Sequence, residues 1–408
     1  MTLLQLVWRG ARFLESPARR FLTLEPDNLL AAGRRRAGER DFEDRSFLNG
    51  LSRLLHALET EARLNLLGRI AARASVVGYL ANRLWLEQDR QRYPEIAAEE
   101  INGPIVITGL PRSGSTLLHG LLAQDPANRV PRTWEMLTPS PPPERDTYES
   151  DPRIAITERQ LRWFDRLAPD FKKIHAMGAR LPEECVPILS HSFLSSQFCS
   201  MYVVPSYQTW VRSQSLLPAY QLHWRFLQHL QWRCRGTRWI LKAPAHLQAL
   251  RELCAVYPDV RVIMAHREPL EVLPSEASLH TVLRQTFSDA VDAATVGREV
   301  TELTADEIAA GLQARDDGCA PQERFFDVRY RDLVADPLGT VRSIYERFAI
   351  PLTTIAAARM RRYVAGTPKD KHGAHVYSLD QFGLNLDEER ERYREYRERF
   401  LLNCAPER

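Results

Sequence analysis

The sequence predicts an α/β fold in which helices flank a central parallel sheet, and two stretches of the chain lead to this prediction. Residues 104–126 consist, in order, of an apolar strand, a turn rich in small residues and an apolar helix. Residues 238–279 alternate strand, helix, strand and helix, which is the pattern of parallel strands joined by crossover helices. Because parallel strands end at a common edge, binding groups are expected to gather at their carboxyl ends.

The first hundred residues show no strand-like alternation and are expected to be helical. Leucine residues recur at helical spacing between 51 and 58, and apolar residues do so again between 70 and 84. We therefore divide the chain into a helical N-terminal region, residues 1–100, and a second domain, residues 101–408. Residues of about 140–235 are expected to form a helical insertion in this domain, rich in aromatic side chains.

Three short apolar runs of the second domain are predicted to be strands, and polar residues follow each of them. The runs are Ile105–Thr108, Trp239–Leu241 and Val260–Ala265. Helices are expected from Ser115, from His246 and from about Pro269. Lys242 and Arg267 follow the second and third strands directly, so both are expected at the edge of the sheet where the first strand ends.

Length and composition describe a large globular protein without a metal motif. With 408 residues the chain exceeds the roughly 100–200 residues of one typical domain. Its net charge of +3 is small for this length and does not indicate a nucleic-acid partner. The six cysteines form no CxxC pair and no His/Cys cluster at metal spacing, so reduced thiols and no metal site are expected.

The sequence carries no recognisable export or membrane-spanning signal. No stretch approaches the ~18 apolar residues of a spanning helix, and no cleavage site follows the short apolar run at the start. We therefore expect a cytoplasmic protein. The basic, amphipathic start of the chain suggests peripheral contact with a membrane surface as a further expectation. The oligomeric state is not predicted.

The turn between the first strand and its helix has the features of an anion-binding loop. Residues 109–114 are followed by a helix N-terminus, which presents unpaired N–H groups, and hydroxyl groups surround it. These hydroxyls belong to Ser113, Ser115 and Thr116. The spacing of Gly109 and Gly114 also fits a Walker A loop, but Ser115 occupies the position of the lysine that this motif requires. A P-loop kinase or nucleotide hydrolase is therefore an alternative, as is a non-catalytic anion-binding scaffold.

The run Pro111-Arg112-Ser113-Gly114-Ser115-Thr116 resembles the 5′-phosphosulfate loop of sulfotransferases that use 3′-phosphoadenosine-5′-phosphosulfate (PAPS). Arg112 stands where the cytosolic branch of that family has lysine. The resemblance covers roughly residues 100–385 and implies a P-loop-like fold with PAPS as co-substrate and no metal. It also implies a transferase that moves a sulfuryl group to an acceptor hydroxyl.

The resemblance extends to the site of the 3′-phosphate of PAPS. Relatives bind this phosphate with an arginine just after a strand and a serine eight positions later, and Arg267 and Ser275 match that spacing. A charged guanidinium and a hydroxyl on the next helix suit such a phosphate. Many relatives have a further arginine where this chain has Leu279. Phe326–Leu333 resembles the family's segment of a strand followed by Tyr-x-Asp-Leu, and this resemblance implies a strand over Phe326–Arg329 and places Tyr330 beside the adenine. It also implies a closing basic loop made of Lys371, His372 and Gly373.

Two basic residues are expected to neutralise charge during transfer. Arg112 lies in the loop, and Lys242 resembles the lysine of the Leu-Lys-Asp-Pro run in Golgi tyrosylprotein sulfotransferases, where this chain has Leu-Lys-Ala-Pro. Both would act on the transferring group and on the oxygen that leaves with the nucleotide.

The base that accepts the hydroxyl proton is expected to be a carboxylate. Several branches of the family use a glutamate shortly after the loop helix, and Glu135 lies at that distance. The reserve candidates are Glu183 and Glu184, and His119 and His246 are weaker ones.

The acceptor is expected to be a small, apolar or lipid-like molecule with a hydroxyl group. Apolar and aromatic residues lie between the cofactor motifs, and such walls suit a hydroxylated small molecule or lipid better than a glycan. These residues are Trp134, Met136, Phe164, Phe171, Met177, Phe193, Phe198, Met201, Tyr202 and Tyr207.

Overall fold

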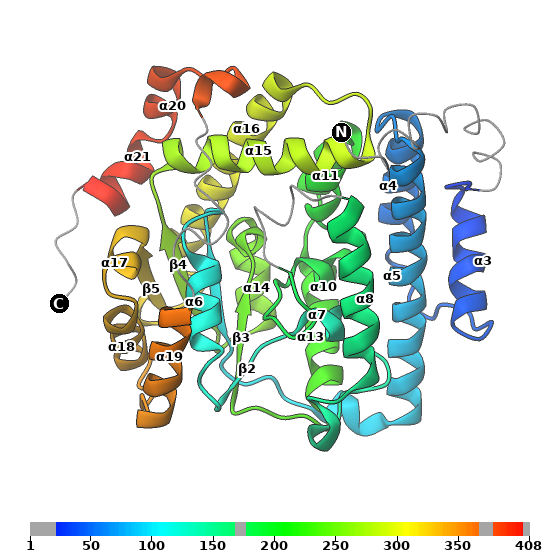
Figure 1. The fold of residues 1–408 in the computed structure, drawn as a ribbon, viewed down its shortest axis with the longest axis horizontal. Helices are drawn as coiled ribbons and strands as arrows, with labels where there is room; N and C mark the ends of the chain where they lie inside the picture. Colours follow the sequence, from blue (N-terminus) through cyan, green and yellow to red (C-terminus); the bar gives the residue numbers. More distant parts are fainter. Residues whose placement is uncertain (1–21, 168–176, 367–377, 403–408) are drawn as a thin grey trace.

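A parallel sheet of five strands lies at the centre of the protein (Figure 1). The computed structural model describes residues 22–167, 177–366 and 378–402. The strand order is β2-β3-β1-β4-β5, and every neighbouring pair is parallel. The strands are β1 (Ile105–Gly109), β2 (Asn128–Arg129), β3 (Arg238–Lys242), β4 (Arg261–His266) and β5 (Phe325–Arg329).

Both faces of the sheet are buried, which explains why its strands read as continuous apolar runs. On β1, Ile105 and Ile107 point into one core, while Val106 between them belongs to the core on the other side. Helices α6 (Ser115–Leu122), α17 (Tyr330–Ala335), α18 (Pro337–Arg347) and α19 (Thr354–Gly366) cover the first face. The other face packs against α13 (Leu217–Gln231), α14 (Leu250–Val256), α15 (Pro269–Phe287) and α16 (Ala293–Asp316).

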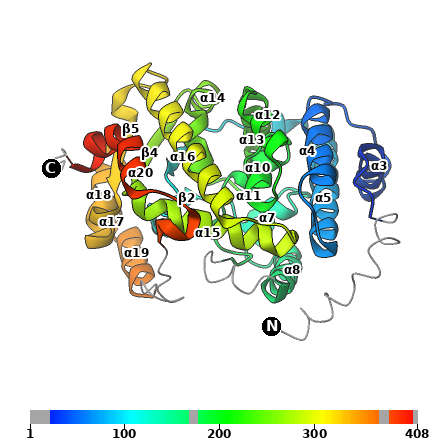
Figure 2. The same ribbon diagram turned by 90° about the horizontal axis from the view of Figure 1, so that it is seen from above.

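Three N-terminal helices lie side by side, away from the sheet (Figure 2). They are α3 (Pro26–Arg36), α4 (Leu48–Thr60) and α5 (Leu66–Arg92). Their apolar faces form a third core, which also includes Phe193 and Tyr207 from later in the chain. On α4, Gly50 lies so close to the Phe193 backbone that an added Cβ would stand 2.5 Å from its carbonyl oxygen. The predicted division at residue 100 is not tested by this arrangement and stays a prediction.

Short helices connect these layers and the remaining described residues. The α-helices are α7 (Thr133–Leu137), α8 (Pro152–Leu167), α10 (Val186–Ser190), α11 (Gln197–Met201), α12 (Pro205–Arg212), α20 (Leu386–Arg392) and α21 (Arg394–Arg397). Short 3-10 segments are Pro94–Ala98, Arg145–Thr147, Pro244–Ala249, Gln322–Arg324 and Leu379–Phe382, and Glu398–Leu402 is a π-helical turn. In the described part of the chain, no helix combines the length and apolar character needed to cross a bilayer.

The three strands predicted from apolar runs are present, and so is the fourth strand, which the family resemblance implied. One further strand was not predicted, and one expectation was wrong. The two-residue strand β2 carries too short a pattern to be recognised in the sequence. Most of the aromatic and apolar residues expected to line an open acceptor pocket pack inside the cores instead. These buried residues are Trp134, Met136, Phe193, Phe198, Tyr202 and Tyr207.

Candidate functional site

The loop that joins β1 to α6 is a tight turn whose backbone requires glycine at both ends. Gly109 has φ 124° and lies against the carbonyl oxygen of Ala265 on β4, where a Cβ would collide. Gly114 has φ 88°, and a Cβ there would stand 2.9 Å from Leu333 and 3.1 Å from the Tyr330 ring. The close packing holds the loop against two neighbouring strand ends, with the first turn of α6 at its exit.

The three hydroxyl groups of the loop region have two different roles. The Ser113 hydroxyl stabilises the loop, and those of Ser115 and Thr116 lie at the N-terminus of α6. The Ser113 hydroxyl donates to the Leu110 carbonyl oxygen at 2.5 Å and thereby closes the turn. Ser115 and Thr116 are the first two residues of α6, where backbone N–H groups have no partner within the helix. These N–H groups and the positive end of the helix dipole are suited to an anion.

Lys242, the last residue of β3, reaches this helix N-terminus from the neighbouring strand. Its Nζ donates to Thr116 Oγ1 at 3.3 Å and forms an ion pair with Glu184. The side chain of Lys242 is 3% exposed and that of Glu184 is 20% exposed. The backbone N–H of Cys185 donates to the Lys242 carbonyl oxygen at 2.8 Å, which fixes the segment that carries Glu184 beside the strand end.

Arg267 follows β4 and contacts the loop from its other side. Its Nη1 donates to the Arg112 carbonyl oxygen at 2.8 Å, and its guanidinium lies 4.1 Å from the centre of the Tyr330 ring. An ion pair with Glu271 at 3.0 Å holds the same guanidinium from α15. The structure therefore brings together three of the predicted nucleotide-binding residues: Arg112, Arg267 and Tyr330.

The remaining predicted nucleotide-binding residues are less closely tied to the loop. Ser275 is half-buried on α15, the helix that begins two residues after Arg267. Lys371, His372 and Gly373 lie outside the described residues. A contribution of these four residues to the site stays a prediction.

Glu135, the predicted base, is fully buried on α7 and is held by several donors. It forms a bidentate ion pair with Arg129 and accepts hydrogen bonds from the Tyr148 hydroxyl at 2.8 Å and the Arg132 N–H at 3.0 Å. Burial alone would lower the pKa of Arg129, but the Glu135 carboxylate outweighs this and raises it. Both oxygens of Glu135 are therefore committed to protein partners.

The reserve carboxylates differ from Glu135 and from each other. Glu183 accepts from the Thr133 hydroxyl and from the Glu184 N–H, each at 3.0 Å, and thus shapes the bend before Cys185. Glu184 is the carboxylate that meets Lys242. Because Lys242 also contacts Thr116, Glu184 is connected to the anion-binding loop through a single side chain.

Sequence reasoning missed a largely buried cluster of titratable side chains behind Arg267. His266, the residue before it, contacts Asp327 on β5 through Nε2 at 2.9 Å, and Asp327 forms a bidentate ion pair with Arg315 on α16. Burial raises the pKa of Asp327, but the hydrogen bonds from His266 and Arg315 outweigh it and hold this pKa below its usual value. In the sequence, only the position of His266 next to Arg267 pointed to this cluster. No sequence spacing relates His266 to Arg315, so their proximity could not be predicted.

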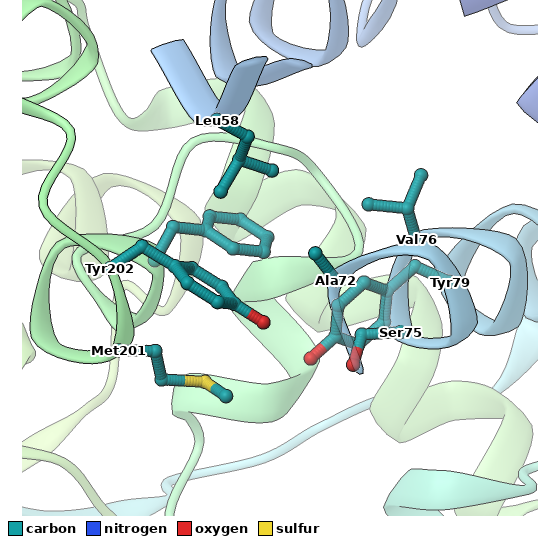
Figure 3. Close-up of a pocket in the computed structure, with 8 residues that line it drawn as sticks. Leu58, Ala72, Ser75, Val76, Tyr79, Met201 and Tyr202 are labelled. Atoms are coloured by element: carbon teal, nitrogen blue, oxygen red, sulfur yellow. The ribbon is translucent and has the colours of Figure 1, made fainter. Parts of the chain in front are cut away.

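A small cavity lies between the N-terminal helices and α11 (Figure 3). Its lining is mainly apolar, and Ser75, Tyr79 and Tyr202 add hydroxyl groups. Within the described part of the chain the Tyr202 hydroxyl has no hydrogen-bond partner. The space open to a water-sized sphere is about 10 Å³, enough for one water molecule. The cavity is therefore too small for an organic acceptor.

In the described residues, no cluster of three or more His, Cys, Asp or Glu side chains is arranged to hold a metal ion. The chemistry of the loop and the strand ends is that of cationic and N–H groups instead.

Comparison with known proteins gives consistent matches across most of the chain. A model of the sulfotransferase family matches residues 104–354. Two curated proteins, both named omega-hydroxy-beta-dihydromenaquinone-9 sulfotransferase Stf3, come from Mycobacterium bovis and Mycobacterium tuberculosis. Each is 27% identical over 296 residues, which cover 68% of this chain and 71% of the relative.

Two crystal structures of mycobacterial sulfotransferases are similar over nearly the whole chain. STF1 from Mycobacterium tuberculosis H37Rv has 33% sequence identity and a TM-score of 0.81, covering 90% of this chain and 97% of that structure. STF9 from Mycobacterium avium has 28% identity and a TM-score of 0.84, covering 93% and 97%. The predicted fold class, a P-loop-like parallel sheet flanked by helices with a helical N-terminal region, is confirmed.

Proposed function

We propose, from the premise that this chain belongs to the sulfotransferase family and is an enzyme of that family, that it transfers a sulfuryl group from PAPS to a hydroxyl of an apolar or lipid-like acceptor. The observation that carries the proposal is the contact of Lys242 with Thr116 at the anion-binding loop. A kinase or hydrolase would need the lysine that Ser115 replaces, and family membership favours transfer over a scaffold role.

PAPS carries anionic groups at both the 5′ and the 3′ positions of its ribose, and the chain offers two groups of donors. The 109–116 loop suits the 5′-phosphosulfate, because N–H groups, hydroxyls and the Lys242 ammonium face the helix N-terminus there. Arg267 and Ser275 suit the 3′-phosphate. The Arg267 side chain is 25% exposed, so it is accessible to a ligand while Arg112 and Tyr330 position it.

In the proposed reaction the acceptor oxygen attacks the sulfur of PAPS. The bond between that sulfur and the 5′-phosphate oxygen breaks, and adenosine 3′,5′-bisphosphate leaves with the bonding electrons. Lys242 and Arg112 stabilise the negative charge that develops on the departing oxygen and on the transferring group. In-line attack requires the acceptor hydroxyl to lie opposite the leaving oxygen, so positioning supplies much of the rate.

The proton of the acceptor hydroxyl passes to a carboxylate, and the contacts favour Glu184 over the predicted Glu135. Glu184 is 20% exposed beside Lys242, whereas Glu135 is fully buried and committed to Arg129. A cation beside a carboxylate favours its charged form, which is the form that accepts a proton, and Lys242 is that cation for Glu184. His119 is less suitable, because burial and then Lys242 lower its pKa to about 3. Glu135 as the base stays the competing proposal.

A lipid-like acceptor is supported by a relative and by one surface of the chain. Both Stf3 relatives are named for a menaquinone derivative. On α8, Ile156 and Trp163 are 43% and 58% exposed, and the exposed residues Arg159, Arg162 and Arg166 share their face. Exposed apolar side chains among arginines suit an anionic membrane surface. The predicted membrane-contacting start of the chain lies outside the described residues.

Two measurements test this proposal. In calorimetry, adenosine 3′,5′-bisphosphate should bind without metal and more tightly than ATP with Mg²⁺. In a transfer assay with labelled PAPS, hydroxylated lipids, sterols and phenols should accept the sulfuryl group more readily than sugars. Tight bisphosphate binding without any transfer would favour the scaffold, and preferred binding of ATP with Mg²⁺ would favour a kinase. Transfer to sugars alone would refute the apolar acceptor and leave the donor assignment intact.

A further inference from the structure

Two cysteines far apart in the sequence meet on the side of the sheet opposite α6. Cys254 lies near the end of α14, and Cys319 lies in the loop that follows α16. Their Sγ atoms are 3.5 Å apart. Cys254 is 7% exposed, whereas Cys319 is partly exposed and gives small molecules access to the pair.

The surroundings of the pair make one sulfur a better nucleophile than the other. The Cys254 thiol donates its hydrogen to the Cys319 sulfur, which lowers the pKa of Cys319, and Arg251 and Arg315 lower it further. The same contact, together with burial, raises the pKa of Cys254. A thiolate is the reactive form of cysteine, so Cys319 is suited to attack an oxidant first. Cys254 is suited to react afterwards with the oxidised Cys319.

The other described cysteines give a contrast within the same chain. Cys185, Cys199 and Cys234 are buried, and burial raises the pKa of each of them, to about 12 for Cys185 and Cys199. No other pair of thiols in contact occurs among the described residues. Of these five thiols, Cys319 combines access, basic neighbours and an adjacent second thiol.

We propose that Cys254 and Cys319 form a peroxide-reactive dithiol that closes reversibly to a disulfide. The Cys319 thiolate attacks one oxygen of hydrogen peroxide, the O–O bond breaks, and the departing hydroxide takes up a proton to give water. The resulting sulfenic acid is attacked by the Cys254 sulfur, the S–O bond breaks, and a second water leaves. Two thiols and one peroxide thus give one disulfide and two waters, with two electrons passing to the peroxide.

Little movement is needed for this step. The sulfurs must approach from 3.5 Å to the disulfide bond length of about 2 Å. Cys319 lies in a loop after the end of α16, which can move more easily than a helix or strand. The pair lies outside the proposed sulfuryl-transfer site, so the inference does not depend on the proposed function.

The test uses the full-length reduced protein treated with hydrogen peroxide. After alkylation of free thiols, trypsin digestion without reductant should release residues 252–261 linked to residues 316–324, as identified by mass spectrometry. Dithiothreitol should separate the two peptides, and Cys185, Cys199 and Cys234 should remain alkylated. The C254S variant should instead accumulate a sulfenic acid at Cys319 that dimedone labels, and C319S should give neither product.

Other results would overturn the proposal. These are two alkylated thiols in the wild-type protein at a peroxide dose that oxidises free glutathione, or a disulfide to a different cysteine as the main product. Dimedone labelling of Cys254 in C319S at the same rate as Cys319 in C254S would refute the assigned order of attack. The wild-type result requires no variant, so a folding defect in either serine variant leaves the proposal testable.

Discussion

The guanidinium of Arg267 donates a hydrogen bond to the backbone oxygen of Arg112, 2.8 Å away. Arg112 itself has a positive φ of 61°, so this contact stabilises a loop conformation that a non-glycine residue rarely adopts. The residue proposed for the 3′-phosphate thus also supports the loop proposed for the 5′-phosphosulfate. Predictions for Arg267 must therefore separate loss of a ligand contact from loss of loop order.

Arg267→Ala should weaken the binding of adenosine 3′,5′-bisphosphate by about 1.5–3 kcal/mol, the size of a charge-assisted hydrogen bond. Calorimetry should show a much smaller loss for the 3′-dephospho nucleotide. Ser275→Ala should act in the same direction but more weakly. Equal losses for both nucleotides would mean that Arg267 acts through loop order alone and would refute its assignment to the 3′-phosphate.

Lys242→Met should reduce kcat by about 10²–10³-fold, because it removes a cation from the site of developing charge. The affinity for adenosine 3′,5′-bisphosphate should change far less, which calorimetry can check. Arg331→Met, which removes an exposed cation from α17, serves as the control and should leave kcat unchanged. A Lys242 variant with normal kcat would argue against any catalytic role of this ammonium.

Glu184→Gln and Glu135→Gln should have different effects. The first should lower turnover by about 10²–10⁴-fold, as expected for loss of a general base, and should lower Tm less than the second, because Glu184 is partly exposed whereas Glu135 is fully buried. The second should destabilise the fold by about 3 kcal/mol or more, because it leaves the buried Arg129 guanidinium without a carboxylate. Thermal melts and turnover assays on both variants distinguish these outcomes. Loss of turnover in Glu135→Gln at an unchanged Tm would restore Glu135 as the base.

The Asp327 carboxylate should make the free energy of unfolding depend on pH in the acid range. Its pKa is lower in the folded chain than in the unfolded one, so its stabilisation is fully present above the unfolded value of about 3.9. It is lost as the pH falls through the lower, folded value. Urea unfolding should be measured at pH 7, 5 and 3 for wild type and Asp327→Asn. The difference between their free energies of unfolding should be smaller at pH 3 than at pH 7. The exposed control Asp387→Asn should show no such trend, and a constant difference for Asp327→Asn would contradict the prediction.

The exposed face of α8 should bind anionic membranes. Sedimentation with vesicles of phosphatidylglycerol and phosphatidylcholine should carry the protein down at low salt, and vesicles of phosphatidylcholine alone should not. Trp163→Ala and Arg159→Glu should each reduce this binding, because one removes the interfacial ring and the other reverses a charge. Arg342→Glu on α18, which lies on a different side of the molecule (Figure 1), is the matched control. Equal losses of vesicle binding for Trp163→Ala, Arg159→Glu and Arg342→Glu would refute the proposal that α8 is the membrane-binding surface.

Much of the central fold could be predicted from the sequence because it is encoded locally. Strands buried on both faces, such as β1, appear as uninterrupted apolar runs, and a helix after a glycine turn has its own start signals. Strand β2 could not be recognised, because two residues carry no pattern. The helix expected from His246 begins as the 3-10 segment Pro244–Ala249, because tertiary packing decides the detailed geometry of a short turn.

The candidate site was predictable only where a strand end determined the position of a side chain. Lys242 is the last residue of β3 and Arg267 directly follows β4, so strand order alone brings them near the loop. Glu184 comes from a segment 58 residues before Lys242, and no spacing in the chain relates the two. Glu135 lies at the distance expected for a base, but its ion pair with Arg129 is a tertiary contact that only the fold reveals.

The core shared by α3–α5 with Phe193 and Tyr207 has a consequence for how this protein can change through evolution. If the first hundred residues were exchanged for a helical segment from another protein, the Phe193 and Tyr207 rings would pack against different side chains. The tight approach of Gly50 to the Phe193 backbone tolerates no larger residue on the incoming helix. Recombination in this part of the gene should therefore succeed only between parents that already agree near positions 50, 193 and 207, so these distant codons should be inherited together.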